Sequence, residues 1–99
     1  MKNINEIIEI LKADKPELIK RYGVKEIGVF GSYVRDEAGA QSDLDILVEF
    51  DANADIGLLK FVNMENHLSD ILSVKVDLVM KSALKPMIGK RILEEVIYL

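Results

Sequence analysis

Residues 30–35 read FGSYVR and residues 42–48 read SDLDILV, and these two stretches decide how the rest of the sequence is interpreted. The first ends a β-prone run in a Gly-Ser pair, and the second opens a strand with Asp-Leu-Asp. A strand that runs into Gly-Ser and then into a helical turn leaves backbone N–H groups free to bind an anion such as phosphate. A plain helix cap is the commoner role of such a turn, so both interpretations stay open for Gly31 and Ser32.

The second stretch places two carboxylates on one side of a predicted strand. Asp43 and Asp45 are two residues apart, so their side chains point to the same face, roughly 6.5–7 Å from each other. Like charges at that distance repel unless a cation lies between them, and Mg²⁺ prefers oxygen ligands of this kind. The alternative is that both aspartates belong to a solvated strand end.

A third aspartate lies inside another β-prone run, residues 74–80, which read VKVDLVM. Asp77 occupies a strand interior, where a buried and unpaired carboxylate would cost several kcal/mol. If the two strands are neighbours, Asp77 completes a three-carboxylate cluster beside the Gly-Ser turn. The alternative is that Lys75 and Asp77 line a solvent-facing side of the strand.

The surrounding pattern alternates between helical and extended periods, which predicts an α/β (α+β) fold with helices packed on a small sheet of about three to four strands. A break at Lys15-Pro16 predicts two short helices before the first strand. The expected elements are helices over about 4–11 and 16–22, a strand over 24–30, a helical turn or two over 32–37, a strand over 43–50, a helix over 55–72, a strand over 74–80 and a helix over 83–97.

Composition narrows the class of protein. We expect the 99 residues to form a single domain, 1–99. The net charge of −4 argues against a long nucleic acid as partner, since phosphate contacts require a basic face. The absence of cysteine, of a signal peptide and of a long apolar run predicts a cytoplasmic protein with no membrane association.

The compound motif GSxxR, then SDxDxxV, then a later strand aspartate resembles the nucleotidyltransferase superfamily that includes DNA polymerase β. Within it, the chain resembles the minimal nucleotidyltransferases, or MNT domain proteins, over about residues 24–80, and the resemblance implies their palm fold. The C-terminal run KRILEEV, residues 90–96, is similar to the ending of these small proteins. One departure is Asp36, where many relatives have glycine; it adds a negative charge near the expected phosphate site.

The resemblance also implies roles for the acidic residues. Asp43, Asp45 and Asp77 would be the catalytic residues and the metal ligands, and Asp77 would lie nearest to the attacking hydroxyl. Two Mg²⁺ ions are expected, one orienting the triphosphate of ATP and one activating the hydroxyl.

The same resemblance assigns the residues around the nucleotide. Gly31 and Ser32 would hold the terminal phosphates of ATP. Arg35 has two interpretations, a phosphate contact or a structural salt bridge that ties the loop to the strand end. Ser42 is expected to brace its loop more than to touch the nucleotide, although it belongs to the predicted nucleotide-binding set.

The function that the resemblance implies is transfer of AMP from Mg-ATP to a hydroxyl group of a partner protein. MNT proteins are typically paired with a HEPN-domain RNase toxin, and act as antitoxins by adenylylating it at a tyrosine. The alternative is an antitoxin that neutralises its partner by binding alone. An apolar patch around Ile92, Val96, Ile97 and Leu99 would serve that second function.

Overall fold

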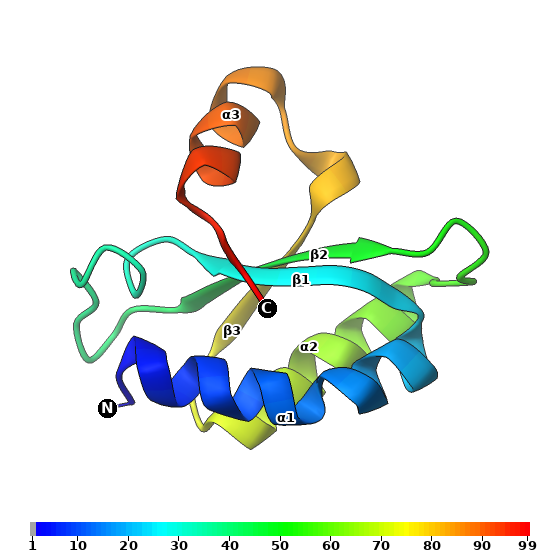
Figure 1. Cartoon of the computed structure of the whole chain (residues 1–99), viewed down its shortest axis with the longest axis horizontal. Helices are drawn as coiled ribbons and strands as arrows, with labels where there is room; N and C mark the ends of the chain where they lie inside the picture. Colours follow the sequence, from blue (N-terminus) through cyan, green and yellow to red (C-terminus); the bar gives the residue numbers. More distant parts are fainter. Residues whose placement is uncertain (1) are drawn as a thin grey trace.

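The computed structural model describes residues 2–99, which form three α-helices, a short 3-10 helix and one four-stranded sheet (Figure 1). In chain order the elements are α1 (Ile4–Tyr22), β1 (Val24–Phe30), β2 (Leu44–Phe50), α2 (Leu58–Leu72), β3 (Val76–Met80), η1 (Lys81–Ala83), α3 (Pro86–Glu95) and β4 (Ile97–Tyr98). In this described part of the chain, no helix is both long and apolar enough to cross a membrane.

The sheet is mixed, with strand order β3-β2-β1-β4. β1 is antiparallel to both β2 and β4, whereas β2 and β3 are parallel. Parallel neighbours need a crossover connection, and α2 supplies it between β2 and β3. The predicted α/β (α+β) fold with a small mixed sheet is therefore confirmed.

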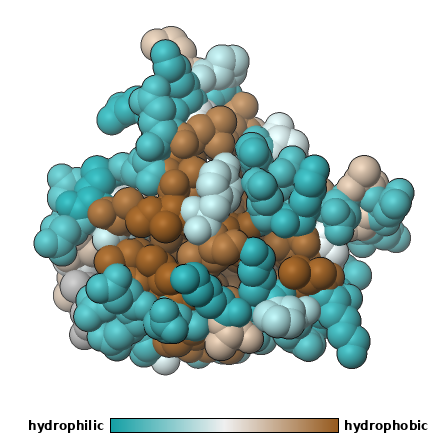
Figure 2. Space-filling model, in the orientation of Figure 1, coloured by the Kyte–Doolittle hydropathy of each residue, from teal (hydrophilic) through white to brown (hydrophobic). Residues whose placement is uncertain are grey.

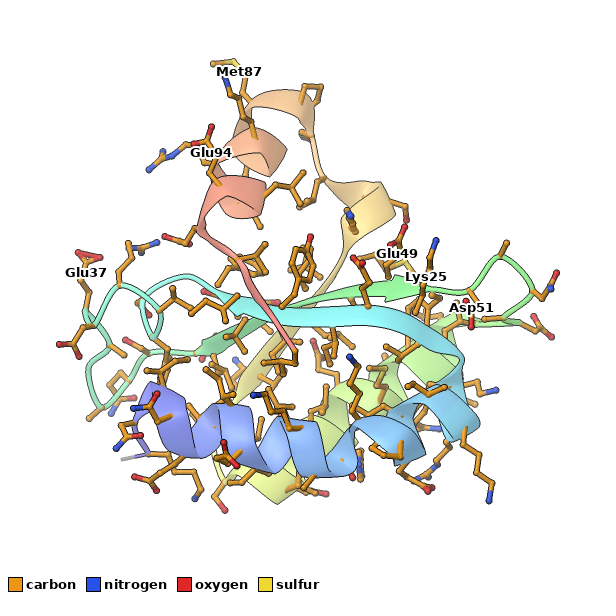
Figure 3. All side chains as sticks on the ribbon, in the orientation of Figure 1. Lys25, Glu37, Glu49, Asp51, Met87 and Glu94 are labelled. Carbon is orange, nitrogen blue, oxygen red and sulfur yellow. The ribbon has the colours of Figure 1, made fainter. Side chains whose placement is uncertain are left out.

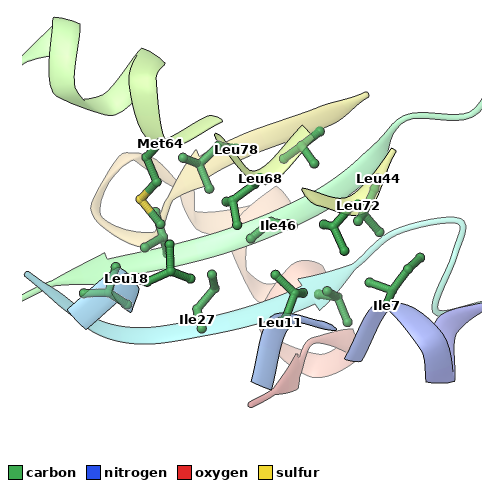
Figure 4. Close-up of a cluster of buried hydrophobic side chains, with 14 of the residues drawn as sticks. Ile7, Leu11, Leu18, Ile27, Leu44, Ile46, Met64, Leu68, Leu72 and Leu78 are labelled. Atoms are coloured by element: carbon green, nitrogen blue, oxygen red, sulfur yellow. The ribbon is translucent and has the colours of Figure 1, made fainter. Parts of the chain in front are cut away.

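The main core lies between one face of the sheet and the pair α1 and α2, whereas α3 stands over the opposite face (Figure 1). Side chains alternate along β2, so that Leu44, Ile46 and Val48 enter this core. Asp45 lies between them in sequence and therefore points to the α3 face. The core is built from fully buried apolar side chains of α1, α2 and the sheet (Figure 4), among them Ile7, Leu11, Leu18, Ile27, Met64, Leu68 and Leu72.

The prediction of two helices before β1 was wrong. α1 runs without interruption from Ile4 to Tyr22 and contains Pro16 in its interior. Proline removes one backbone donor and so weakens a helix, but it does not forbid one. Burial of Leu11 and Leu18 on either side of Pro16 holds the two halves of the helix against the same core.

The expected helical turn over residues 32–37 is present as hydrogen-bonded turns, with the Val34 and Arg35 N–H groups donating to the Gly31 carbonyl. The last boundary differs from the prediction. The C-terminal helix ends at Glu95, and Ile97–Tyr98 pairs with β1 as β4. The edge of β1 that faces away from β2 has backbone groups free to pair with this segment, which contains β-prone residues. The Leu99 N–H also donates to the Ile27 carbonyl at 3.0 Å.

Candidate functional site

The strand register brings two of the predicted aspartates together. Asp45 in β2 is the direct partner of Asp77 in β3, and of Phe30, the last residue of β1. Neighbouring strands lie about 4.8 Å apart, so Asp45 and Asp77 are side by side on the α3 face of the sheet. Asp43 precedes β2 by one residue. The condition that the two aspartate-bearing strands be neighbours is therefore met.

Asp77 is exposed, so the expectation of a buried carboxylate inside a strand was wrong. The reason is the sheet order: β3 is an edge strand, and its α3-facing side is open to water at Asp77. Lys75 is also exposed, with 81% of its side chain accessible, and its Nζ lies 4.0 Å from Asp43 Oδ2. Asp77 is therefore solvent-facing, as the alternative interpretation expected, and it also lies beside Asp45 on the neighbouring strand.

Asp45 is partly buried and lies among other negatively charged side chains. Burial, followed by the charges of Asp77 and Asp43, raises the pKa of Asp45 to about 6. The nearby Arg35 opposes this shift without cancelling it. Three carboxylates within range of one another are electrostatically unfavourable, and a cation among them would relieve the repulsion.

The donor set suits a hard cation that brings other oxygen ligands. Among the described residues, no three His, Cys, Asp or Glu side chains are placed so that they could hold a metal ion by themselves. Mg²⁺ commonly takes only one or two protein carboxylates and completes its shell with water and substrate phosphates. Asp45 and Asp77, paired in register, fit that requirement. The metal-binding role of Asp43, Asp45 and Asp77 stays a prediction.

The Gly-Ser turn lies directly against Asp45. Gly31 has φ +84°, and a Cβ at this position would collide with the Asp45 carboxylate, 2.9 Å from its Cγ. The turn is closed by the N–H groups of Val34 and Arg35, which both donate to the Gly31 carbonyl, at 3.0 and 3.2 Å. Glycine is therefore required here both by backbone conformation and by the close approach of a carboxylate.

The departure at Asp36 has a conformational explanation. Asp36 has φ 58°, in the left-handed region that glycine adopts freely. Aspartate is among the few other residues that tolerate this region, because its short side chain can form local hydrogen bonds. The substitution of glycine by aspartate is thus compatible with the same turn.

Glu95, at the end of α3, contacts the turn and was missed by the sequence analysis. The Gly31 N–H donates to Glu95 Oε2 at 2.7 Å, and Arg35 Nη1 donates to Glu95 Oε1 at 2.7 Å. Burial raises the pKa of Glu95, but the hydrogen bonds from Arg35 and Gly31 outweigh it, so the pKa lies below its usual value. The KRILEEV ending was the only sequence signal, and it carried no role.

Arg35 forms the structural salt bridges that one of its two interpretations required. Its guanidinium bonds Glu95 and, at 2.5 Å, Glu37. The salt bridge to Glu95 ties the loop to the end of α3. The sequence-based interpretation had expected the loop to be tied to a strand end. Ser42 braces its own loop, since its hydroxyl accepts a hydrogen bond from the Gly39 N–H at 2.9 Å.

A cavity of about 250 Å³ lies between the turn and α3. It brings together three of the predicted site residues, Gly31, Arg35 and Asp45, with Glu95. The rest of its lining is Phe30, Ile88, Arg91 and Ile92. Its lining, within the described chain, does not include Ser32, Ser42, Asp43 or Asp77.

The model of the nucleotidyltransferase domain family matches residues 4–99. Protein adenylyltransferase MntA of Thermococcus cleftensis is 54% identical over 98 residues, which cover 99% of this chain and 97% of that protein.

Solved structures agree with the sequence comparison. A structure described provisionally as a minimal nucleotidyltransferase has a TM-score of 0.81 and 33% identity, with 99% of this chain and 97% of that chain covered. The fold of this chain is also similar to that in a structure of tri-AMPylated Shewanella oneidensis HEPN toxin in complex with MNT antitoxin, at TM-score 0.59 and 21% identity. That match covers 95% of this chain and 66% of that chain, and it supports the fold alone.

Proposed function

The chain belongs to the nucleotidyltransferase domain family, and from that premise we propose that it transfers the AMP part of Mg-ATP to a hydroxyl group of a partner protein. The observation that carries the proposal is the register of the sheet. Asp45 has Asp77 as its partner on one side and the last residue before Gly31 on the other. Two carboxylates and the Gly-Ser turn thus share one end of three strands, which supports the proposal because nucleotidyl transfer from a triphosphate needs metal ligands beside a phosphate site.

Each group has a separate task in this proposal. The Gly31 N–H and the Arg35 guanidinium bind the triphosphate, because both are donors that favour phosphate oxygens. Asp45 and Asp77, with Asp43, would hold Mg²⁺, which neutralises phosphate charge when bound. Ser32 and Ser42 lie in the turn and loop that carry these donors, and shape them.

The chemical step joins the acceptor oxygen to the α-phosphorus of ATP. As this bond forms, the bond between the α-phosphorus and the oxygen that bridges to the β-phosphorus breaks, and pyrophosphate leaves. Asp77 accepts the proton of the attacking hydroxyl, because it is the acidic residue on the open edge strand.

The exposure of Asp77 favours a macromolecular acceptor. An edge strand whose carboxylate faces solvent lets a hydroxyl on another protein approach without entering a deep pocket. We propose a HEPN-domain toxin as that acceptor and a tyrosine as its modified residue, with the present chain as antitoxin. The similarity to protein adenylyltransferase MntA supports this choice of acceptor class.

The test is transfer of label from ATP carrying ³²P in its α-phosphate to a purified HEPN-domain protein, in the presence of Mg²⁺. Asp45→Asn and Asp77→Asn should each lower the rate by about a hundredfold or more, since each removes charge stabilisation at the reacting phosphate. Asp51→Asn is the matched control. Asp51 is exposed and follows the end of β2 that lies away from Asp45 (Figure 3), and its substitution makes the same chemical change. Equal rates for all three variants would refute the proposal.

A second function, neutralisation by binding alone, is favoured by the outer surface of α3. Met87, Ile88 and Leu93 are 86%, 61% and 44% exposed, and Met87 lies at the end of α3 farthest from the sheet (Figure 3). The patch predicted around Ile92, Val96, Ile97 and Leu99 is only partly exposed.

Leu99 packs against the core, which removes it from that patch. If the partner is silenced equally by the wild type and by Asp45→Asn, with no mass added to it, binding alone accounts for the activity.

A further inference from the structure

Glu95 occupies the donors that a nucleotide would need. The Gly31 N–H and the Arg35 guanidinium are both directed at its carboxylate, one at each oxygen, at 2.7 Å. A carboxylate and a phosphate accept the same charge-assisted hydrogen bonds from such donors. The two anions cannot use them at the same time.

We propose that the Glu95 carboxylate is an internal substitute for a phosphate group, and that a nucleotide binds only after the end of α3 releases Gly31 and Arg35. The inference rests on the proposed function, since it concerns the same anion site. It makes Glu95 a positioning residue that holds the turn in its binding conformation and competes with the substrate.

The cavity is consistent with a closed state. Its volume of about 250 Å³ is below the roughly 300–1,000 Å³ of ordinary ligand pockets. Ile88, Arg91 and Ile92 of α3 form one of its walls. Movement of α3 away from the turn would enlarge the cavity and free both donors together.

The attachment of α3 allows such a movement. Of its residues Gly89 is buried, while Met87, Ile88 and Leu93 are exposed. On the side of the molecule shown in Figure 2, apolar side chains also gather below α3. An element with little buried apolar surface opens at lower free energy than the core.

Electrostatics favour the exchange of Glu95 for a metal-bound nucleotide. Glu95 adds to the negative charge that Asp45 experiences from Asp77 and Asp43. Departure of Glu95 therefore removes one of the charges that repel an incoming triphosphate. Arg91, which also faces Glu95, stays in the cavity lining as a cation.

The test measures the affinity of the purified chain for the Mg²⁺ complex of α,β-methylene-ATP, which cannot be cleaved at the α-phosphorus, by calorimetry. Glu95→Gln should tighten the Kd by about tenfold, because the fraction of binding-competent molecules rises. Glu95→Asp keeps the charge but shortens the side chain, and should also tighten binding. Glu94→Gln is the control, since Glu94 is exposed on α3 (Figure 3) and the variant has the same net charge as Glu95→Gln.

A second probe, inorganic tripolyphosphate, is followed through the amide signal of Gly31 by ¹⁵N NMR. In Glu95→Gln this signal should shift at about tenfold lower tripolyphosphate concentration than in the wild type. The same probe keeps the anion site testable if nucleotide affinity is weak.

The outcomes separate the two proposals. If the nucleotide binds the wild type and Glu95→Gln equally well, the internal-anion proposal is overturned while the proposed function stands. If tripolyphosphate binds Glu95→Gln more tightly but no protein binds nucleotide, the internal anion is supported and the proposed function fails. If neither probe binds any variant, both proposals fall.

Discussion

Gly31 is the residue on which the Gly-Ser turn depends, because its φ of +84° and its contact with Asp45 both exclude a side chain. We expect Gly31→Ala to abolish nucleotide binding and to lower the free energy of unfolding by about 1–2 kcal/mol or more, since a Cβ strains the backbone and displaces the carboxylate. Calorimetry and urea unfolding measure the two effects.

Gly39→Ala is the matched control for that substitution. A Cβ on Gly39 would have no neighbour within 4 Å. Its variant should bind nucleotide and unfold like the wild type, and a loss equal to that of Gly31→Ala would contradict the prediction.

Asp45 should make the stability of the metal-free protein fall with rising pH. Its pKa is raised from 3.8 to about 6, mainly by burial and then by Asp77 and Asp43. Below pH 3.8 Asp45 is protonated in both states, so it has no effect. As the pH rises toward 6, the unfolded chain loses the proton that the folded protein keeps, and stability declines until both states are ionised.

We therefore expect Asp45→Asn to be more stable than the wild type at pH 7.5, by about 1–2 kcal/mol after allowance for solvent screening. At pH 4 the gain should nearly vanish. Urea unfolding in EDTA measures both values, with Asp51→Asn as the control. A gain that is larger at pH 4 than at pH 7.5 would be inconsistent with a raised pKa.

At the scale of the element, α1 shows how packing overrides a local signal. Pro16 lacks the N–H that would bond the Lys12 carbonyl, yet α1 continues through it. Pro16 is exposed, so replacing it removes little packing. We expect Pro16→Ala to raise the free energy of unfolding by about 1–2 kcal/mol, because the regained helical hydrogen bond exceeds the added entropy of the unfolded chain.

Thermal and urea unfolding measure this change. Ala13→Gly, at another exposed position of the same helix, should lower stability by about 1 kcal/mol and calibrates the response of α1. A decrease in stability for Pro16→Ala would mean that the proline is favourable where it stands.

The short strand β4 illustrates a contact that a helical pattern conceals. β4 lies close to Gly28, where a Cβ would come within 2.6 Å of Val96 Cγ2 and 2.8 Å of the Ile97 carbonyl oxygen. Glycine at position 28 therefore lets the C-terminal segment pass across β1 and leads α3 back to the turn. The position of Glu95 depends on this crossing.

At the scale of the whole molecule, the two faces of the sheet differ in how firmly they are covered. α1 and α2 bury large apolar side chains in a continuous core, whereas in α3 the buried residue is Gly89, and Met87, Ile88 and Leu93 are exposed. We expect hydrogen exchange, followed by mass spectrometry, to be faster in α3 and β4 than in α1 and β1, since sub-global opening begins where little apolar surface is buried. Equal protection on both faces would contradict a mobile α3.

The sequence by itself determined the class of fold and most of the site. Hydrophobic period distinguished helices from strands, and alternation along the second strand set Asp45 apart from its apolar neighbours Leu44 and Ile46, because these properties depend on neighbours along the chain. The residue pattern also singled out Asp77 and the Gly31 turn, and the family resemblance assigned them roles that remain predictions.

Only the tertiary structure decided the rest. The exposure of Asp77 follows from its place on an edge strand, and the continuity of α1 follows from the core beneath Pro16. Glu95 reaches Gly31 across 64 positions of the chain. No local pattern encodes such a contact, because it exists only once β4 has paired with β1 and fixed where the end of α3 lies.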